Sequence, residues 1–271
     1  MTAALADRSV SAPATIGFGN ILRSEWTKLR SVRSTFWTVG VAVVLGLAVG
    51  VIQCVESRSN ILGGKEGVHG FDAPLSSLVG VYIAQVAFGA LGVLAITSEY
   101  GTGMIRATVA AVPQRRAMVA AKQIVLTGSV LVVAEVLSFV SFGIGQAILS
   151  PAHVSVGLGA PGALRATVGG GLYLTAVAVL GFGLGALIRH TAGALSAFFG
   201  ILFALTVVVD LLPTNLRNDL INYLPANAGS QIITTHPTID ALSPWVGLGV
   251  LCLYAVVPLI AAFALIERRD T

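Results

Sequence analysis

The stretch SEYGTGMIRATVAAVPQRRAMVAAK, residues 98–122, interrupts one of the most apolar parts of this chain. It contains four of the protein's sixteen basic residues, and long intervals almost free of charge lie on both sides of it. Charged residues make up 10% of the 271 positions, whereas soluble domains average about 25%. Too few charges remain to cover a water-facing surface. We therefore expect an integral membrane protein in which this stretch is a short connection outside the membrane.

Six intervals are long and apolar enough to cross a bilayer as helices, for which ~20 residues are needed. Each must be helical, because an isolated strand would leave its backbone groups without partners in lipid. The alternating ~10-residue segments of a membrane barrel do not occur. The sequence therefore predicts an all-α integral membrane fold with spans at 35–55, 75–97, 123–150, 166–188, 191–210 and 244–266.

The basic residues set the expected orientation, since short loops rich in Lys and Arg stay in the cytoplasm. With the N-terminus inside, twelve of the sixteen basic residues are cytoplasmic and four are external. Both termini are then cytoplasmic, as a flexible tail at 1–16 and a short tail at 267–271. The stretch 98–122 is cytoplasmic as well. The residues 213–243 form an outer re-entrant or interfacial segment, in which Pro225 is expected to end a short helix.

An amphipathic helix is expected at 17–34, immediately before the first span. Its apolar residues recur at helical spacing, and polar or basic residues, among them Arg23, Lys28 and Arg30, occupy much of the other side. A helix of this kind lies along the inner leaflet of the membrane. A basic flank that only obeys the topology rule is the alternative interpretation.

Within 98–122, the glycines that follow Glu99 permit a sharp reversal as the chain leaves the membrane. Thr102 suits the cap of a short helix, whose apolar residues share one face until Pro113 ends it. Two arginines after Pro113 form a basic turn, and Lys122 is expected to snorkel at the start of the third span. The stretch thus predicts a short cytoplasmic helix. A loop that only anchors the topology is the alternative.

Three segments resemble the permease subunits of ABC-2-type transporters, in particular the half-size bacterial permeases encoded apart from their ATPase. These are SEWTKLRSVRSTFW at 24–37, TSEYGTGMIRATVAAVPQRRAMVAAK at 97–122 and NYLPANAGSQI at 222–232. The likeness covers nearly the whole chain, and the second segment is the most specific. In that family the region after span two holds a coupling helix that docks on the nucleotide-binding subunit. The matching positions here are Glu99, Tyr100, Gly101, Thr102, Gly103, Arg106, Pro113, Arg115 and Arg116.

The resemblance implies the permease subunit of an ATP-binding cassette transporter in the bacterial plasma membrane, most often an exporter, here of a lipophilic or amphipathic substrate. The chain has no GxxxxGK[ST] motif, so ATP and Mg²⁺ are expected in a separate cytosolic ATPase subunit. No cofactor and no enzymatic activity are expected in this chain. Six helices are few for a complete path, so a second permease copy or a sister permease is expected. Membrane lipid, but not nucleic acid, is a further expected contact.

Glu135 is the only charged residue deep within any expected span. An ionised acid at the centre of a membrane helix costs ~2.5–3.5 kcal/mol, so it calls for water, a substrate cation or polar neighbours. Glu135 is therefore a candidate for the translocation path, and a carboxyl that ties helices together is the structural alternative. The competing function is an ATPase-independent secondary transporter or an intramembrane enzyme that uses Glu135. The four histidines are scattered over different loops, so no metal site is expected.

The glycines inside the spans have a separate expected use. Gly181 and Gly185 form a GxxxG pattern, and Gly143 and Gly145 lie in the third span. Because small residues let helices approach closely in lipid, we expect these positions to be packing surfaces.

Overall fold

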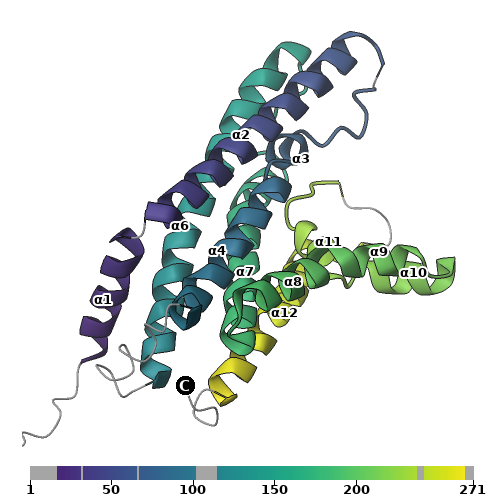
Figure 1. Cartoon of the computed structure of the whole chain (residues 1–271). Helices are drawn as coiled ribbons and strands as arrows, with labels where there is room; N and C mark the ends of the chain where they lie inside the picture. The colour runs from purple at the N-terminus through teal and green to yellow at the C-terminus, as the bar shows by residue number, and fades with distance from the viewer. Residues whose placement is uncertain (1–16, 32, 66, 102–114, 237–240, 266–271) are drawn as a thin grey trace, which may run out of the picture.

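The structure is a computed structural model that describes residues 17–265, apart from 32, 66, 102–114 and 237–240, with the backbone alone given for 33–35 and 115 (Figure 1). Every regular element among the described residues is a helix. Six helical segments are long and apolar enough to cross a membrane. The predicted all-α fold with six candidate spans is confirmed, and it indicates a multi-pass membrane protein.

The central element of the bundle is α7 (Ala163–Ile188). It packs against α4 (Val81–Gly101), α6 (Arg115–Leu149) and α12 (Pro244–Leu265) (Figure 1). The first candidate span belongs to α2 (Arg33–Leu62), which packs on α4 and α6. Most residues of α7 are buried, in keeping with a helix that is apolar around its whole circumference.

Glycines bring α4 and α7 into backbone contact. A Cβ atom placed on Gly92 would lie 2.1 Å from the carbonyl oxygen of Ala178, and one on Gly181 would lie 2.2 Å from the carbonyl oxygen of Gly89. A Cβ on Gly185 would also meet α4, at 2.7 Å. No side chain fits at these distances, so the predicted packing role of the GxxxG pattern is confirmed.

The second expected span, 75–97, is divided into two helices. The short helix α3 (Ala73–Leu78) is capped by Asp72, whose carboxylate accepts a hydrogen bond from the N–H of Leu75 at 2.9 Å. The longer helix α4 then starts after Gly80, where a Cβ would lie only 1.8 Å from the carbonyl oxygen of Gly46 in α2. The cap and this close approach explain why the apolar interval does not form one continuous helix.

Two other candidate spans are longer than their apolar intervals. The first continues to Leu62 instead of ending near 55, and α6 starts at Arg115 instead of near 123 and ends in a 3₁₀ turn, η1 (Ser150–Ala152). Polar residues extend these helices beyond the part that a hydropathy pattern detects. Of the two glycines noted in the third span, Gly145 packs against Ser77 of α3, whereas a Cβ on Gly143 would meet open space.

The fifth candidate span consists of three joined pieces: α8 (Thr191–Phe199), the π-helical segment η2 (Gly200–Ala204) and α9 (Leu205–Asp210). Only Arg189 and His190 separate it from α7, and the His190 ring nitrogen Nδ1 caps α8 by accepting from the N–H of Gly193 at 3.2 Å. In Figure 1, α8 and α9 run away from the bundle, and α10 (Thr214–Ile221) continues beyond them.

The segment after α10 returns to the bundle. We expected Pro225 to end the preceding helix, but α10 already ends at Ile221, and Pro225 opens α11 (Pro225–Ser230). Proline fits the first turn of a helix, where the backbone N–H that it lacks would have no partner. Ile232 and Ile233 are fully buried. This part of the expected outer segment therefore packs into the bundle rather than lying on its surface.

The first described helix, α1 (Phe18–Ser31), lies beside α6 (Figure 1). Its two buried residues are Ile21 and Glu25. One face of α1 is thus packed against the protein, and its location at the membrane interface stays a prediction.

Candidate functional site

Four charged side chains from three helices meet at the end of the bundle where α1 lies. Glu25 and Lys28 belong to α1, Glu99 lies near the end of α4, and Lys122 lies near the start of α6. We call these four residues the ion cluster. They come from positions far apart in the sequence, so the ion cluster joins three separate helices.

The contacts within the ion cluster form a closed ring of ion pairs. The Lys122 ammonium (Nζ) lies 2.6 Å from Glu25 Oε2 and 2.8 Å from Glu99 Oε1. The Lys28 ammonium lies 2.7 Å from Glu25 Oε1 and 3.4 Å from Glu99 Oε1. Each ammonium therefore contacts both carboxylates, and the two positive charges balance the two negative ones.

Three members of the ion cluster are buried: the exposed fraction is 4% for Glu25, 6% for Glu99 and 8% for Lys122. Taking one ion out of water costs several kcal/mol, and only close partners repay that cost. Glu99 Oε2 has no hydrogen-bond partner among the described residues. The arrangement is therefore sensitive to the loss of any one member, since the remaining charges would stay buried without full compensation.

The ion cluster shifts the pKa values of its two α1 residues in the direction that keeps both charged. Burial by itself would raise the pKa of Glu25, but the ammonium groups of Lys122 and Lys28 outweigh it and hold the pKa below 4.5. Burial would lower the pKa of Lys28, but hydrogen bonds and attraction from Glu25 and Glu99 raise it above 10.5. Glu25 and Lys28 are therefore both ionised near neutral pH.

The spacing of residues in α1 explains how one short helix reaches the ion cluster. Ile21, Glu25 and Lys28 follow each other by four and three positions, so they share one face of the helix. Ile21 packs into the bundle and Glu25 is buried beside it. Trp26 and Arg30, which also lie four positions apart, share a neighbouring face.

The residues that match the coupling motif are divided by the structure. Glu99 is a member of the ion cluster. Gly101 is the exposed last residue of α4, and Arg116 is exposed in the first turn of α6. Arg115 begins α6, with only its backbone described. Four positions lie outside the described residues: Thr102, Gly103, Arg106 and Pro113.

Tyr100 lies next to the ion cluster in sequence and connects α4 to the end of α7. It is half-buried, and the Arg189 guanidinium carbon lies 5.3 Å from the centre of its ring, which is a cation–π contact. Arg189 follows the last residue of α7 in a left-handed backbone conformation, with φ of 61°. The ends of α4 and α7 are therefore joined close to the ion cluster.

Sequence analysis found only part of this site. Lys122 does not snorkel as expected, because two carboxylates hold its ammonium inside the protein. The sequence pattern gives Glu25 no role and places Lys28 only on the polar side of α1. An available signal was the presence of two acids, Glu25 and Glu99, in segments that are otherwise basic. Acids in such places call for buried positive partners.

Glu135 lies apart from the ion cluster, 13 residues beyond Lys122 on α6, which is about 20 Å at 1.5 Å per residue. It is half-buried and faces α7, where a Cβ on Gly171 would lie 2.4 Å from its carboxyl carbon. One carboxyl oxygen, Oε2, has no hydrogen-bond partner among the described residues. The structure therefore places Glu135 on the α6–α7 interface, without a charged partner in the part of the chain that it describes.

A second polar group lies at the opposite end of the bundle and contacts mainly the backbone. Asp72 accepts hydrogen bonds from the N–H groups of Thr235 at 2.6 Å and His236 at 3.1 Å, besides capping α3. Arg165, in the first turn of α7, donates to the carbonyl oxygens of Ile232 at 3.0 Å and Thr234 at 2.9 Å. Together with Gln146, these residues form what we call the backbone-bound network.

Gln146 completes the backbone-bound network from α6. Its amide nitrogen donates to the Ala73 carbonyl oxygen at 3.1 Å and to the Ser77 hydroxyl at 2.9 Å, and its amide oxygen accepts from the N–H of Val156 at 2.8 Å. Gln146 is 24 residues beyond Lys122, so about 36 Å of helix separates the two sites.

In the described part of the chain, no three His, Cys, Asp or Glu residues come close enough to hold a metal ion. No known protein family matches this sequence, and no curated protein matches it. The candidate functional site is therefore defined by its geometry, which is that of an ionic joint between helices.

Proposed function

We propose that this chain is the permease subunit of an ATP-binding cassette transporter, driven by a separate ATPase, and that the α1 end of the bundle faces the cytoplasm. In this proposal it exports a lipophilic or amphipathic substrate across the bacterial plasma membrane. The observation that carries the proposal is the ion cluster. Its member Glu99 lies near the end of α4, and Lys122 lies near the start of α6. Residues 102–114 connect these two helices along the chain.

The ion cluster suits a joint that passes movement from a cytoplasmic partner to the bundle. A partner bound at 102–114 would displace the end of α4 and the start of α6, and both are tied to α1 by ion pairs of 2.6–3.4 Å. Tyr100 and Arg189 connect the same region to α7. Partner binding at one short segment would thus act on four helices together.

The cytoplasmic orientation is supported by the distribution of positive charge, as for the positive-inside rule. Arg116, Arg189 and the two lysines of the ion cluster lie at the α1 end. In the proposed assembly, two permease subunits surround one path, and two cytosolic ATPase subunits hold ATP and Mg²⁺. Mass measurement of the intact complex in nanodiscs tests the stoichiometry. An active unit with one permease chain would contradict it.

Charge reversal tests the docking of the ATPase. The variant with Arg106, Arg115 and Arg116 changed to Glu is co-purified with a candidate ATPase subunit that carries a Walker-A motif. We expect the affinity for the ATPase to fall by more than about tenfold, because several complementary charge contacts are lost. Substrate-stimulated ATP hydrolysis should be lost as well. The matched control changes Arg58, Lys65 and Arg217 to Glu, which places the same charge change in α2, in the connection that follows it and in α10.

Unchanged association and unchanged ATP hydrolysis in the first variant would contradict the proposed function. Thermal unfolding of both variants is measured alongside, so that loss of the fold is not mistaken for loss of docking. A further result against the proposal would be equal weakening by the control variant, since that would indicate a non-specific effect of net charge.

A second candidate function is an ATPase-independent secondary transporter that uses Glu135. It is favoured by the Glu135 carboxyl oxygen that has no hydrogen-bond partner among the described residues. We compare Glu135→Gln with Glu135→Leu in both transport and thermal stability. If Glu135 borders the path, the Gln variant keeps its stability, but transport of cationic substrates, or its pH dependence, changes. If the carboxyl only joins α6 to α7, the Gln variant transports normally and only the Leu variant is destabilised, by ~1 kcal/mol.

A further inference from the structure

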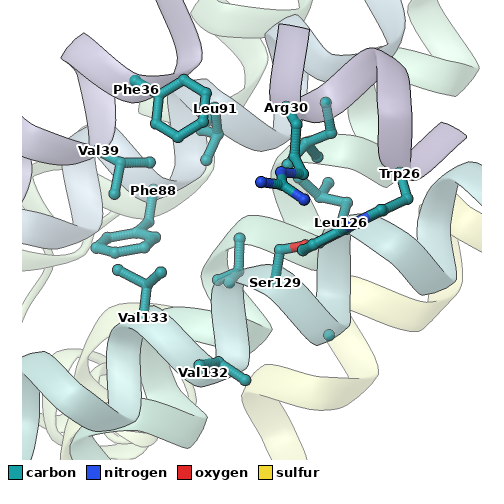
Figure 2. Close-up of a pocket in the computed structure, with 13 residues that line it drawn as sticks. Trp26, Arg30, Phe36, Val39, Phe88, Leu91, Leu126, Ser129, Val132 and Val133 are labelled. Carbon is teal, nitrogen blue, oxygen red and sulfur yellow. The ribbon is translucent and has the colours of Figure 1, made fainter. Parts of the chain in front are cut away.

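A cavity of about 430 Å³ lies between α1, α2, α4 and α6 (Figure 2). Its walls include Phe36 of α2, Phe88 of α4, and Leu126 and Val133 of α6. None of the four residues of the ion cluster lines it. Its volume is in the range of sites that hold small molecules, and its walls are apolar, as in most such sites.

The polar part of the cavity comes from α1. Trp26 and Arg30 lie one turn apart, and the Arg30 guanidinium carbon is 5.8 Å from the centre of the Trp26 ring. Among the described residues, Arg30 forms no ion pair, and no hydrogen bond engages either side chain. Ser129, also in the wall, already donates to the carbonyl oxygen of Val125 at 2.6 Å. Arg30 and Trp26 are thus free to donate to a ligand.

The cavity opens beside the outer faces of α2 and α6. At this opening Phe36 is 59% exposed and Val132 is 64% exposed, on helices apolar enough to cross a membrane. From Leu126 to Val133 the cavity follows α6 for about 10 Å, which is less than the half-thickness of a ~30 Å hydrocarbon core. It therefore fits within one leaflet, with the cation supplied by α1.

We propose that this cavity is a binding site for one anionic phospholipid of the leaflet next to α1. One acyl chain occupies the space between Phe36, Phe88 and Val133. The phosphate group accepts hydrogen bonds from the Arg30 guanidinium, which is held against the Trp26 ring, and from the indole N–H. A charged donor paired with a phosphate gives the stronger class of hydrogen bond.

Both parts of the cavity are needed to define this ligand. Apolar walls bind a hydrocarbon chain but do not select a charge, and a free phosphate ion would leave those walls empty. The Arg30 guanidinium has no ion pair among the described residues, so it can select an anion. The indole ring beside it favours the headgroup region of the membrane. The inference does not rest on the proposed function, because it requires no ATPase.

Native mass spectrometry of the full chain tests the site. The protein is purified in a detergent that removes loosely held lipid, then titrated with phosphatidylglycerol or with phosphatidylcholine of the same acyl chains. We expect one phosphatidylglycerol to bind about tenfold more tightly than phosphatidylcholine, because the choline ammonium of phosphatidylcholine offsets the charge of its phosphate and is repelled by the Arg30 guanidinium. Arg30→Gln should lower phosphatidylglycerol binding to the level of phosphatidylcholine, and Arg30→Lys should keep most of the preference.

A filled cavity gives an independent arm of the experiment. Gly128 lines the cavity, and a Cβ at this position meets no atom within 4 Å, so Gly128→Leu is chosen to fill part of the space. Gly143 on the same helix is equally open but does not line the cavity, so Gly143→Leu is the matched control. We expect Gly128→Leu to lose at least about tenfold in binding of both lipids, and Gly143→Leu to bind as the wild type does.

Three results would overturn the inference. The first is equal binding of the two lipids by the wild-type protein, and the second is lipid binding by Gly128→Leu that matches Gly143→Leu. The third is displacement of bound phosphatidylglycerol by inorganic phosphate alone, which would assign the site to a free anion. Thermal unfolding of each variant is measured in parallel. If Gly128→Leu is destabilised, the preference for phosphatidylglycerol is compared between Arg30→Gln and Arg30→Lys instead. An equal preference in these two variants would then overturn the inference.

Discussion

At the α1 end of the bundle, charged side chains contact one another, whereas at the α3 end polar side chains contact the backbone. The ion cluster joins α1, α4 and α6 through four ion pairs, three of them between different helices. The backbone-bound network of Asp72, Gln146 and Arg165 holds α3, α6 and α7 through backbone groups. Its side chains contact the N–H groups of residues 156, 235 and 236 and the carbonyl oxygens of residues 73, 232 and 234.

This difference indicates which end of the bundle can change its contacts. Backbone groups are fixed by the local fold, so a side chain bound to them has one suitable position. An ammonium shared by two carboxylates, such as that of Lys28 at 2.7 Å and 3.4 Å, can move from one to the other with little loss. We therefore expect the α1 end to be adjustable and the α3 end to be fixed.

The largest effect is expected from Lys122→Met. The substitution leaves Glu25 and Glu99 buried beside only one ammonium, and breaking a buried ion pair costs about 3–5 kcal/mol. The measurement is the free energy of unfolding in detergent. Lys122→Arg keeps the charge and serves as the control, and we expect it to lose less than Lys122→Met. Equal stability of the Met variant and the wild type would remove the energetic argument for the ion cluster.

A smaller effect is expected at the other end from Asp72→Ala. The variant loses the cap of α3 and leaves the N–H groups of Thr235 and His236 without their acceptor. Loss of a cap costs about 1 kcal/mol, and unsatisfied donors cost about 1–3 kcal/mol. Asp72→Asn keeps an acceptor oxygen and should lose less. A larger loss for Asp72→Ala than for Lys122→Met would reverse the comparison of the two ends.

The stabilisation that the ion cluster provides should also depend on pH. The pKa of Glu25 is lowered from 4.5, so its stabilising effect is complete above pH 4.5 and is lost as the pH falls through the lowered value. The pKa of Lys28 is raised from 10.5, so its effect is complete below pH 10.5 and is lost as the pH rises through the raised value. The check is the unfolding midpoint against pH for the wild type and Glu25→Gln.

In that experiment the difference in midpoint between the wild type and Glu25→Gln should be constant on the plateau between these limits and should shrink in acid. The reason is that protonated Glu25 resembles the amide. A difference that stays constant down to strongly acidic pH would show that the charge of Glu25 does not contribute to stability.

The smallest effect is expected from Asp210→Asn. Asp210 pairs with Arg217 at 3.0 Å, but both side chains are close to half exposed. Exposed ion pairs contribute about 0–1 kcal/mol. The free energy of unfolding of Asp210→Asn should therefore fall by no more than about 1 kcal/mol. Added salt should remove the difference in stability between the variant and the wild type. A loss as large as that of Lys122→Met would mean that burial does not separate strong from weak ion pairs in this protein.

The sequence could predict the six spans because each is long, and burial in lipid requires uninterrupted apolar residues. It could not predict the break at Gly80, because that break depends on contact with Gly46 in another helix. The candidate site was predicted in part, since the motif drew attention to Glu99. Its partners Glu25 and Lys122 are distant in sequence, and no periodic pattern connects them.

The glycines of this protein differ in how freely they can change over generations. Gly80, Gly92 and Gly181 would each place a Cβ within 2.2 Å of a carbonyl oxygen in a neighbouring helix, whereas Gly128 and Gly143 have open space around them. A backbone oxygen cannot be replaced by mutation, so no second substitution nearby can restore room at the first three positions. Natural variants should therefore keep glycine at these contacts, whereas packing of the helices places no such restriction on a Cβ at Gly128 and Gly143.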